Sequence, residues 1–366
     1  MSKPAGIIFI AALVLSGCAT APYRAPNEPL PPNWPPTNQV PKPQIRPPSR
    51  PITPVVKTNL PPTARLANVV RPAPVVTWIP LNRWAADHKI GAPHLLSETP
   101  AAMYAIGSTN GAMVLEIGSR EAIWNGIEIN LGFEPQLIDH QIYLHELDLR
   151  RNLEPLLCDP PLTFSANRVI VIDPGHGGSN TGTHSVLDGR LEKEFTLDWA
   201  LQLAPLLAAN GWQVFLTRTN DTDVSLDDRA AFADAHHADL FISLHFNSAA
   251  PSQTQGGLET YCLTPTGMPS TLIRGSTDSW SENFSNNGHD AENLALAVRL
   301  HAALLRAAGL EDRGVRRARF MAVLDGQHCP AVLIEGGYLS NPHEAQLIES
   351  PEFRQKLAGA IAGALK

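Results

Sequence analysis

The sequence is short of charge and of cysteine, and each shortage excludes something. Only 17% of the 366 residues are charged, against about 25% in a typical globular protein, which favours a secreted protein over a cytosolic one. The 4 cysteines contain no C-x-x-C pair, so a cysteine-based metal site is not expected. Cys158, Cys262 and Cys329 are expected to be small buried side chains, although an oxidising compartment would allow one disulfide among them.

Positive charge is scarce outside the N-terminal segment. The net charge is −7; residues 1–21 carry +1 and residues 22–65 carry +5, so the remaining 301 residues carry −13. A protein that binds nucleic acid through its phosphates needs a basic face. We therefore expect no nucleic-acid partner for the folded part.

Residues 1–17 are typical of a secretory signal peptide. Lys3 precedes an apolar run over 7–15, which is far shorter than the ~20 residues that span a bilayer. The plain alternative is a buried N-terminal helix. Residues 15–18, Leu-Ser-Gly-Cys, resemble the lipobox of bacterial lipoproteins. The resemblance implies that Cys18 is lipidated and anchors the chain to a membrane. With Ala19 rather than Asp after it, the implied location is the periplasmic side of the outer membrane.

Residues 18–65 are expected to form a proline-rich linker. Fifteen prolines fall between positions 22 and 62. Because proline fixes φ and lacks a donor, neither a helix nor a sheet core is expected there. A polyproline-II-like segment of this length would reach on the order of 120 Å, which suits a tether between a membrane and a folded unit.

Residues 66–157 are expected to form a small α+β domain. Strands are predicted over 75–79, 113–117, 121–124, 127–131 and 141–144, and helices over 81–88 and 146–152. Asn125-Gly126 between two short apolar runs predicts a tight hairpin. The two similar strand–helix units, with Gly-Ser-Arg-Glu-Ala at 118–122 between them, resemble the copper-amine-oxidase N-terminal-like domain. That resemblance implies wall or partner binding; the histidines here have no ligand spacing, so no copper site is expected.

Residues 166–366 are expected to form an α/β domain with a mostly parallel central sheet and helices on both faces. Predicted strands and helices alternate, which is the pattern of such a sheet. Strands are predicted over 168–172, 213–217, 240–244, 257–263, 320–324 and 331–334. Helices are predicted over 192–208, 226–235 and 290–308, with further helices starting after Asn341 and Ser350. The long polar segment 264–289 is expected to be either a substrate-shaping lid or plain disorder.

Four side chains capable of metal and acid–base chemistry lie where strands end or helices begin. His176 follows the first strand, His245 and Glu335 lie at the ends of two others, and Glu192 opens a helix. Sites in parallel sheets lie at the carboxyl ends of the strands. Two imidazoles and a carboxylate suit a catalytic zinc with one open position. Taken singly, each residue has a structural interpretation; together they favour a site.

Five ordered motifs then carry a family resemblance. They are Val-Ile-Asp-Pro-Gly-His-Gly-Gly (171–178), Leu-Glu-Lys-Glu (191–194), Ser-Leu-Asp-Asp-Arg (225–229), a segment at 239–247 and a segment at 332–341. They resemble the zinc-dependent N-acetylmuramoyl-L-alanine amidases of the amidase_3 type. The resemblance implies Zn²⁺ held by His176, Glu192 and His245, and Glu335 as the catalytic glutamate. It implies hydrolysis of the amide between N-acetylmuramic acid and L-alanine in peptidoglycan. Arg229 matches a family position and is interpreted as structural, paired with a nearby acid.

Two other functions remain open from the sequence. A zinc carboxypeptidase on stem peptides also uses two histidines, a glutamate ligand and a catalytic glutamate. Its first two ligands usually lie a few residues apart, whereas His176 and Glu192 are sixteen apart. A non-catalytic wall-binding lipoprotein is disfavoured because all four catalytic positions are filled. No activator protein is identified.

Overall fold

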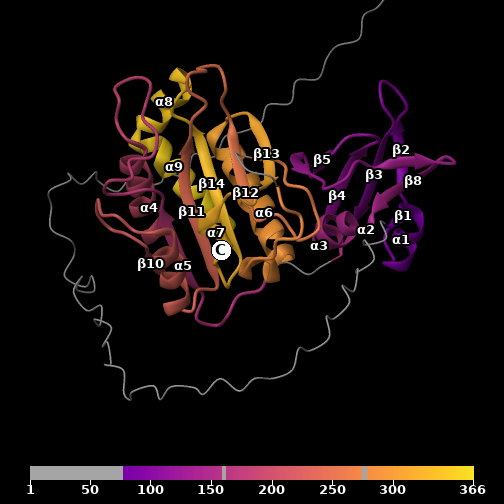
Figure 1. Ribbon diagram of the computed structural model, residues 1–366, viewed down its shortest axis with the longest axis horizontal. Helices are drawn as coiled ribbons and strands as arrows, with labels where there is room; N and C mark the ends of the chain where they lie inside the picture. Colours follow the sequence, from indigo (N-terminus) through magenta and orange to yellow (C-terminus); the bar gives the residue numbers. More distant parts are fainter. Residues whose placement is uncertain (1–76, 159–161, 274–277) are drawn as a thin grey trace, which may run out of the picture. The chain divides into compact units, whose positions relative to one another are not determined.

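The computed structural model describes residues 77–158, 162–273 and 278–366 (Figure 1). The predicted signal peptide, Cys18 and the proline-rich linker lie outside these residues. Among the helices of the described part, none combines the length and the apolar character needed to cross a bilayer.

The C-terminal half, residues 162–366, is organised around six strands of a larger sheet. Their spatial order is β10-β9-β11-β14-β12-β13, in which only the β12–β14 pair is antiparallel. The six strands are β9 (Val169–Pro174), β10 (Gln213–Leu216), β11 (Leu240–Asn247), β12 (Leu258–Cys262), β13 (Asp312–Arg317) and β14 (Ala331–Tyr338). The predicted mostly parallel sheet is confirmed.

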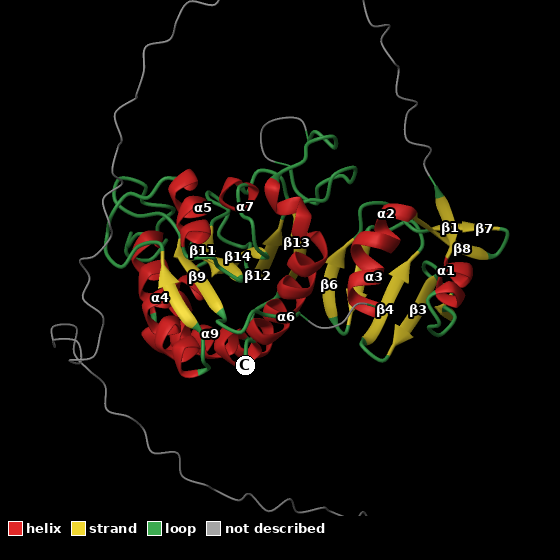
Figure 2. Cartoon of the chain, turned by 90° about the horizontal axis from the view of Figure 1, so that it is seen from below, coloured by secondary structure: helices red, strands yellow, loops and turns green. Residues whose placement is uncertain are grey.

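Helices cover both faces of this sheet, as predicted (Figure 2). On one face lie α4 (Glu192–Ala209), α6 (Asp290–Ala308) and α9 (Pro351–Ala364), and on the other α5 (Leu226–Ala235) and α7 (Ala322–Asp325). Side chains alternate between the two faces along each strand. Ile172 therefore packs into the hydrophobic core beneath α4, α6 and α9, and Val171 packs into the smaller core beneath α5 and α7. A short 3-10 helix (Ser285–His289) and α8 (Pro342–Glu349) complete this half.

Two predicted helix starts are formed as the sequence indicates. The Ser225 hydroxyl accepts a hydrogen bond from the Asp228 amide at the start of α5. The Asn341 side chain caps α8 by accepting from the amides of His343 and Glu344, with proline at the first helical position. These caps satisfy amides that have no partner within the helix.

The preceding residues form antiparallel strands and short helices. The strands are β1 (Trp78–Pro80), β2 (His94–Ser97), β3 (Met103–Ser108), β4 (Gly111–Glu116), β5 (Glu121–Trp124), β6 (Ile127–Asn130), β7 (Gln136–Ile138) and β8 (Gln141–His145). The helices are α1 (Leu81–Asp87), α2 (Glu146–Asp148) and α3 (Glu154–Leu157), with a π-helical turn at Leu149–Leu153. The Asn125-Gly126 hairpin is confirmed: both residues have positive φ, and Trp124 pairs with Ile127.

One strand pair joins the two halves. β6 pairs with β13 in parallel through Ile129 and Val315, and the Glu128 amide donates to an Asp312 carboxylate oxygen at 3.0 Å. The strands β2 to β6 therefore continue the same eleven-stranded sheet. The predicted domain boundaries at 157 and 166 stay predictions.

Some predicted elements differ from the structure. The strand predicted over 320–324 is wrong: the chain forms the short helix α7 there, because a short apolar run fits a buried strand or a buried helix turn equally well. The helix predicted over 146–152 is interrupted by the π-helical turn. Strand β13 was not predicted, since three of its six residues are arginines.

The described parts of segment 264–289 are bonded to the body of the protein. Asp278 forms a buried ion pair with Arg319. The side-chain amides of Asn286 and Asn287 donate to the carbonyls of Cys329 and Thr264 at 2.8 and 3.0 Å. Whether this segment acts as a lid stays a prediction.

Candidate metal centre

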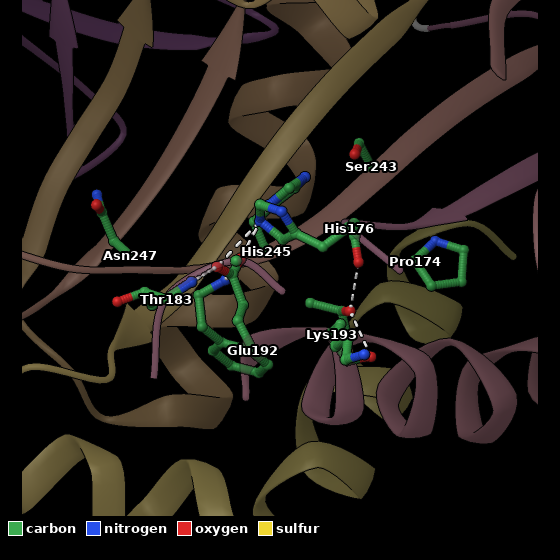
Figure 3. Close-up of polar contacts among 12 residues, drawn as sticks. Pro174, His176, Thr183, Glu192, Lys193, Ser243, His245 and Asn247 are labelled. Atoms are coloured by element: carbon green, nitrogen blue, oxygen red, sulfur yellow. Dashed lines mark hydrogen bonds and ion pairs between the residues drawn. The ribbon is translucent and has the colours of Figure 1, made fainter. Parts of the chain in front are cut away.

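His176, Glu192 and His245 converge on one point (Figure 3). One ligand atom from each lies within 4.8 Å of the other two. Glu192 Oε2 is 3.0 Å from His176 Nε2, and Glu192 Oε1 is 2.9 Å from His245 Nδ1. The structure therefore brings together the three residues that the sequence predicts as ligands.

The sheet topology explains this convergence. β9 and β11 are adjacent parallel strands, so their carboxyl ends meet at one edge. His176 lies just after β9, His245 lies near the end of β11, and Glu192 is the first residue of α4. Residues 69 positions apart in the chain thus become neighbours.

Burial and hydrogen bonding keep Glu192 ionised. Only 4% of the residue is exposed, and it accepts hydrogen bonds from the amides of Thr183 and Phe246 at 3.0 and 3.1 Å. Burial alone would raise the pKa of Glu192, but the hydrogen bonds to His176 and His245 lower it well below its usual range. Burial likewise opposes the charging of His176, yet the contact with Glu192 leaves the pKa of that imidazole raised.

Two glycines make the close approach possible. A Cβ at Gly175 would lie 2.2 Å from Cε1 of His245, and a Cβ at Gly182 would lie 2.5 Å from Oε2 of Glu192. Gly182 also has a φ of +68°, a conformation that other residues rarely adopt. Gly175 directly precedes His176, and its lack of a side chain admits the second imidazole.

A residue that sequence reasoning missed orients His176. The Asn180 carboxamide oxygen lies 2.9 Å from His176 Nδ1. With Nδ1–H donating to Asn180, Nε2 is left facing Glu192 and available to a metal. In the sequence, the one feature that points to this role of Asn180 is its position four residues after His176.

Glu335 lies on the neighbouring strand β14, beside one of the three predicted ligands. It is paired in register with His245 of β11 on one side and with Glu259 of β12 on the other. Laterally paired residues project on the same face of a sheet, so the three side chains form a row across it. The register therefore places the predicted catalytic carboxylate next to a predicted ligand.

Glu259, at the end of that row, is a second residue that sequence reasoning missed. It is 2% exposed, yet it accepts hydrogen bonds from Asn247, Tyr261, Tyr338 and Arg313 at 2.8 to 3.1 Å. Burial and the charge of Glu259 raise the pKa of both tyrosine hydroxyls, and Glu335 adds to the effect. The sequence feature that could have identified Glu259 is an acidic residue within a strand of otherwise apolar or uncharged residues.

A cavity of about 470 Å³ opens beside the two imidazoles. Its wall includes His176, His245 and Arg229 together with apolar side chains from the start of α5, from the segment around α7 and from β14. The apolar members are Val224, Leu226, Phe320, Met321, Ala322, Val323 and Leu333. A short peptide can lie in such a cavity with one bond at the ligand group.

The donor set fits a divalent metal ion. Two imidazole nitrogens and one carboxylate oxygen are the ligands that catalytic zinc sites use with an open fourth position. No other histidine of the described residues joins this group; His236 Nδ1, for example, lies 2.8 Å from its own helix carbonyl at Phe232.

Comparison with known protein families shows which family the chain resembles. Residues 170–366, more than half of the sequence, match the Amidase_3 family, described as N-acetylmuramoyl-L-alanine amidase. The chain belongs to this family. The class of enzyme that the resemblance implied is therefore confirmed at the level of the family.

Individual relatives cover the same region. The chain is 36% identical over 200 residues to the probable cell wall amidase LytH of Staphylococcus epidermidis, covering 54% of this chain and 57% of that one. It is 34% identical over 199 residues to the N-acetylmuramoyl-L-alanine amidase CwlM of Bacillus licheniformis, covering 54% and 66%. A solved amidase from Clostridium difficile 630 is 31% identical, covers 55% of this chain and 96% of its own, and has a TM-score of 0.45. The chain thus spans less than two thirds of the length of the two curated relatives.

Proposed function

We propose that this protein is a zinc-dependent peptidoglycan amidase that cleaves the bond between N-acetylmuramic acid and the L-alanine of the stem peptide. The observation that carries the proposal is the row of His245 and Glu335 on paired strands, with His176 and Glu192 closing the ligand group. Membership of the amidase family supports the choice of bond.

Metal binding, proton transfer and substrate binding are assigned to different residues of the chain. His176, Glu192 and His245 would hold the zinc ion, which when bound polarises the scissile carbonyl and activates water. Glu335 accepts the proton of the attacking water and delivers it to the departing alanine nitrogen. The apolar wall beside the imidazoles holds the substrate and limits access of bulk water to the reacting bond.

The products separate this function from its competitors. Purified full-length protein is incubated with peptidoglycan sacculi, with and without a chelator, and the soluble products are identified by mass spectrometry. We expect intact stem peptides and peptide-free glycan, and no release after chelation. Release of single amino acids would instead indicate a carboxypeptidase, and binding without release a wall-binding protein.

We also propose that the protein is a lipoprotein of the periplasm, held at the outer membrane through Cys18. The lipobox-like residues 15–18 and the proline-rich segment support this location. A tethered amidase would reach the wall polymer while remaining attached to the membrane. The resemblance of residues 66–157 to a copper-amine-oxidase N-terminal-like domain supports a role of that region in wall or partner binding.

A further inference from the structure

The backbone that carries His176 is held by two buried arginines. Arg229 donates to the carbonyl of His176 at 2.8 Å and to that of Pro174 at 3.1 Å. Arg218 donates to the carbonyl of Gly175 at 2.8 Å and to that of Pro174 at 3.0 Å. Three successive carbonyls at the end of β9 are thus fixed by guanidinium groups.

This segment needs to be held. His176 has a φ of +63°, in the left-handed region that non-glycine residues rarely occupy. Such a conformation persists only where the surrounding structure determines it. A guanidinium presents several donors in a rigid plane and can bond more than one carbonyl at once, which a lysine ammonium on a flexible stem does poorly.

Arg218 also contacts the element that carries the second ligand. The same nitrogen that bonds the Gly175 carbonyl donates to the carbonyl of Lys193 at 2.9 Å. Lys193 directly follows Glu192, and Gly175 directly precedes His176. The Thr196 hydroxyl strengthens this link, because it donates to the Gly175 carbonyl at 2.8 Å and accepts from Arg218 at 3.1 Å.

The charges in this cluster are poorly balanced. Arg218 and Arg229 are 3% and 4% exposed, and the buried acid beside them is Asp173, which pairs with Arg229. Burial and the charge of Arg229 lower the pKa of Arg218, and the charges of Asp173 and Asp221 only partly oppose this. Two buried cations around one buried carboxylate are a costly way to stabilise a fold. Their contacts with the flanks of two ligands indicate a purpose in the metal site.

We propose that Arg218 and Arg229 are positioning residues that preorganise His176 and Glu192 for metal binding. Arg229 sets the conformation of His176, and Arg218 sets the spacing between the His176 segment and the start of α4. This inference rests on the metal site of the proposed function. Its readout is metal binding, so it is tested independently of peptidoglycan hydrolysis.

The test compares full-length wild type with R218K and R229K, with R354K as the matched control. Arg354 is equally buried, at 3% exposed, but pairs with Asp198 and the Ile348 carbonyl rather than with the ligand segment. Zinc affinity is measured by competition with a chromophoric chelator. We expect affinity to fall about 10- to 100-fold in R218K and R229K, the range for residues that orient metal ligands, and to stay within about twofold in R354K.

A second readout separates positioning from general stability. The visible absorption spectrum of the cobalt-substituted protein is expected to change in R218K and R229K and to match wild type in R354K, while the thermal midpoint of metal-free protein falls in all three. Unchanged zinc affinity and cobalt spectrum in R218K and R229K would overturn the inference.

If the arginine variants do not fold, the T196V variant is used to test the positioning role. It removes the hydroxyl that links Arg218 with the carbonyls of Gly175 and Lys193, and we expect zinc affinity to fall about tenfold. T196V with wild-type affinity would refute the inference. Wild type that binds zinc tightly but releases no stem peptides would refute the proposed function and leave this inference standing.

Discussion

At the scale of single residues, environment decides what each ionisable group does. Glu192 is almost fully buried, but two imidazoles and two amides hold it as an anion. Asp148 is buried as well, and hydrogen bonds only partly offset the cost of burial, so its pKa is raised to about 6. The same carboxyl chemistry therefore gives a candidate metal ligand in one place and a readily protonated structural acid in another.

The role of Glu335 is tested by E335Q. Glutamine keeps the shape of the side chain but cannot accept a proton, so we expect peptidoglycan hydrolysis to fall by about 10²- to 10⁴-fold, the usual contribution of a general acid–base group. Zinc affinity is expected to stay at the wild-type level, whereas H176A loses the metal. An E335Q protein that retains full hydrolytic activity would contradict the assigned mechanism.

Asp148 gives a dependence of stability on pH. It accepts hydrogen bonds from the amides of Gly132 and Phe133, and burial raises its pKa from 3.8 to about 6. Because the native state then binds the proton more tightly than the unfolded chain, the free energy of unfolding falls as pH rises from about 4 to about 6. The fall attributable to this group is about 3 kcal/mol.

Urea unfolding of wild type and D148N across that pH range measures the effect. Asparagine cannot titrate, so the stability of wild type relative to D148N is expected to decrease from pH 4 to pH 6 and to level off above it. A difference between the two proteins that does not change with pH would show that Asp148 does not titrate in this window.

At the scale of elements, the site depends on how closely a strand end, a helix start and a neighbouring strand approach. Gly175 lies where β9 leaves the sheet, directly against the ring of His245. Lateral pairing of β11 with β14 adds Glu335 to the same edge. None of these contacts is local in the chain, so each depends on the sheet being assembled.

The approach of β9 to β11 is tested by G175A, with G359A as the matched control. An alanine Cβ at 175 would lie 2.2 Å from the His245 ring, so we expect His245 to move and zinc affinity to fall about tenfold or more. At Gly359, inside α9, no atom lies within 4 Å of an added Cβ. G359A is therefore expected to keep full zinc affinity and to gain up to about 1 kcal/mol in stability. Equal zinc affinity in the two variants would contradict the steric argument.

At the scale of the whole molecule, the folded unit continues beyond the family-matched region. The pairing of β6 with β13, the bond from Glu128 to Asp312 and the bonds from Arg317 to Arg151 and Asn152 cross between the halves. Arg317 is 3% exposed, so these bonds are shielded from water. The N-terminal strands are thus attached to the C-terminal sheet by strand pairing and by buried and half-buried polar contacts.

The proposed anchor is tested by C18S, with C158S as the matched control. Without a lipidated cysteine the chain loses the acyl chains that hold it to the membrane, so we expect C18S to move from the membrane fraction to the soluble fraction of a bacterium with two membranes. C158S is expected to stay with the membrane fraction. Membrane association of C18S at the wild-type level would exclude this anchor.

Much of the fold of the C-terminal half could be predicted from the sequence alone. Continuous apolar runs, capping residues at Ser225 and Asn341, and the ordered motifs predicted the strands, the helix starts and the four site residues, because these signals are local and strong. The prediction failed at β13, because a segment with three arginines does not show the apolar pattern of a strand. It also failed at α7, where a run of four or five apolar residues fits a buried strand or a buried helix turn.

The tertiary structure alone decided which distant residues meet. Asn180, Glu259 and Arg218 carry no distinctive local pattern, since their roles arise from strand register and from segments packed across the sheet edge. The order of β12 and β14, and the pairing of β6 with β13, are likewise long-range choices made by the burial of whole faces. Local chemistry names the candidates for a site, and only the assembled sheet sets the distances between them.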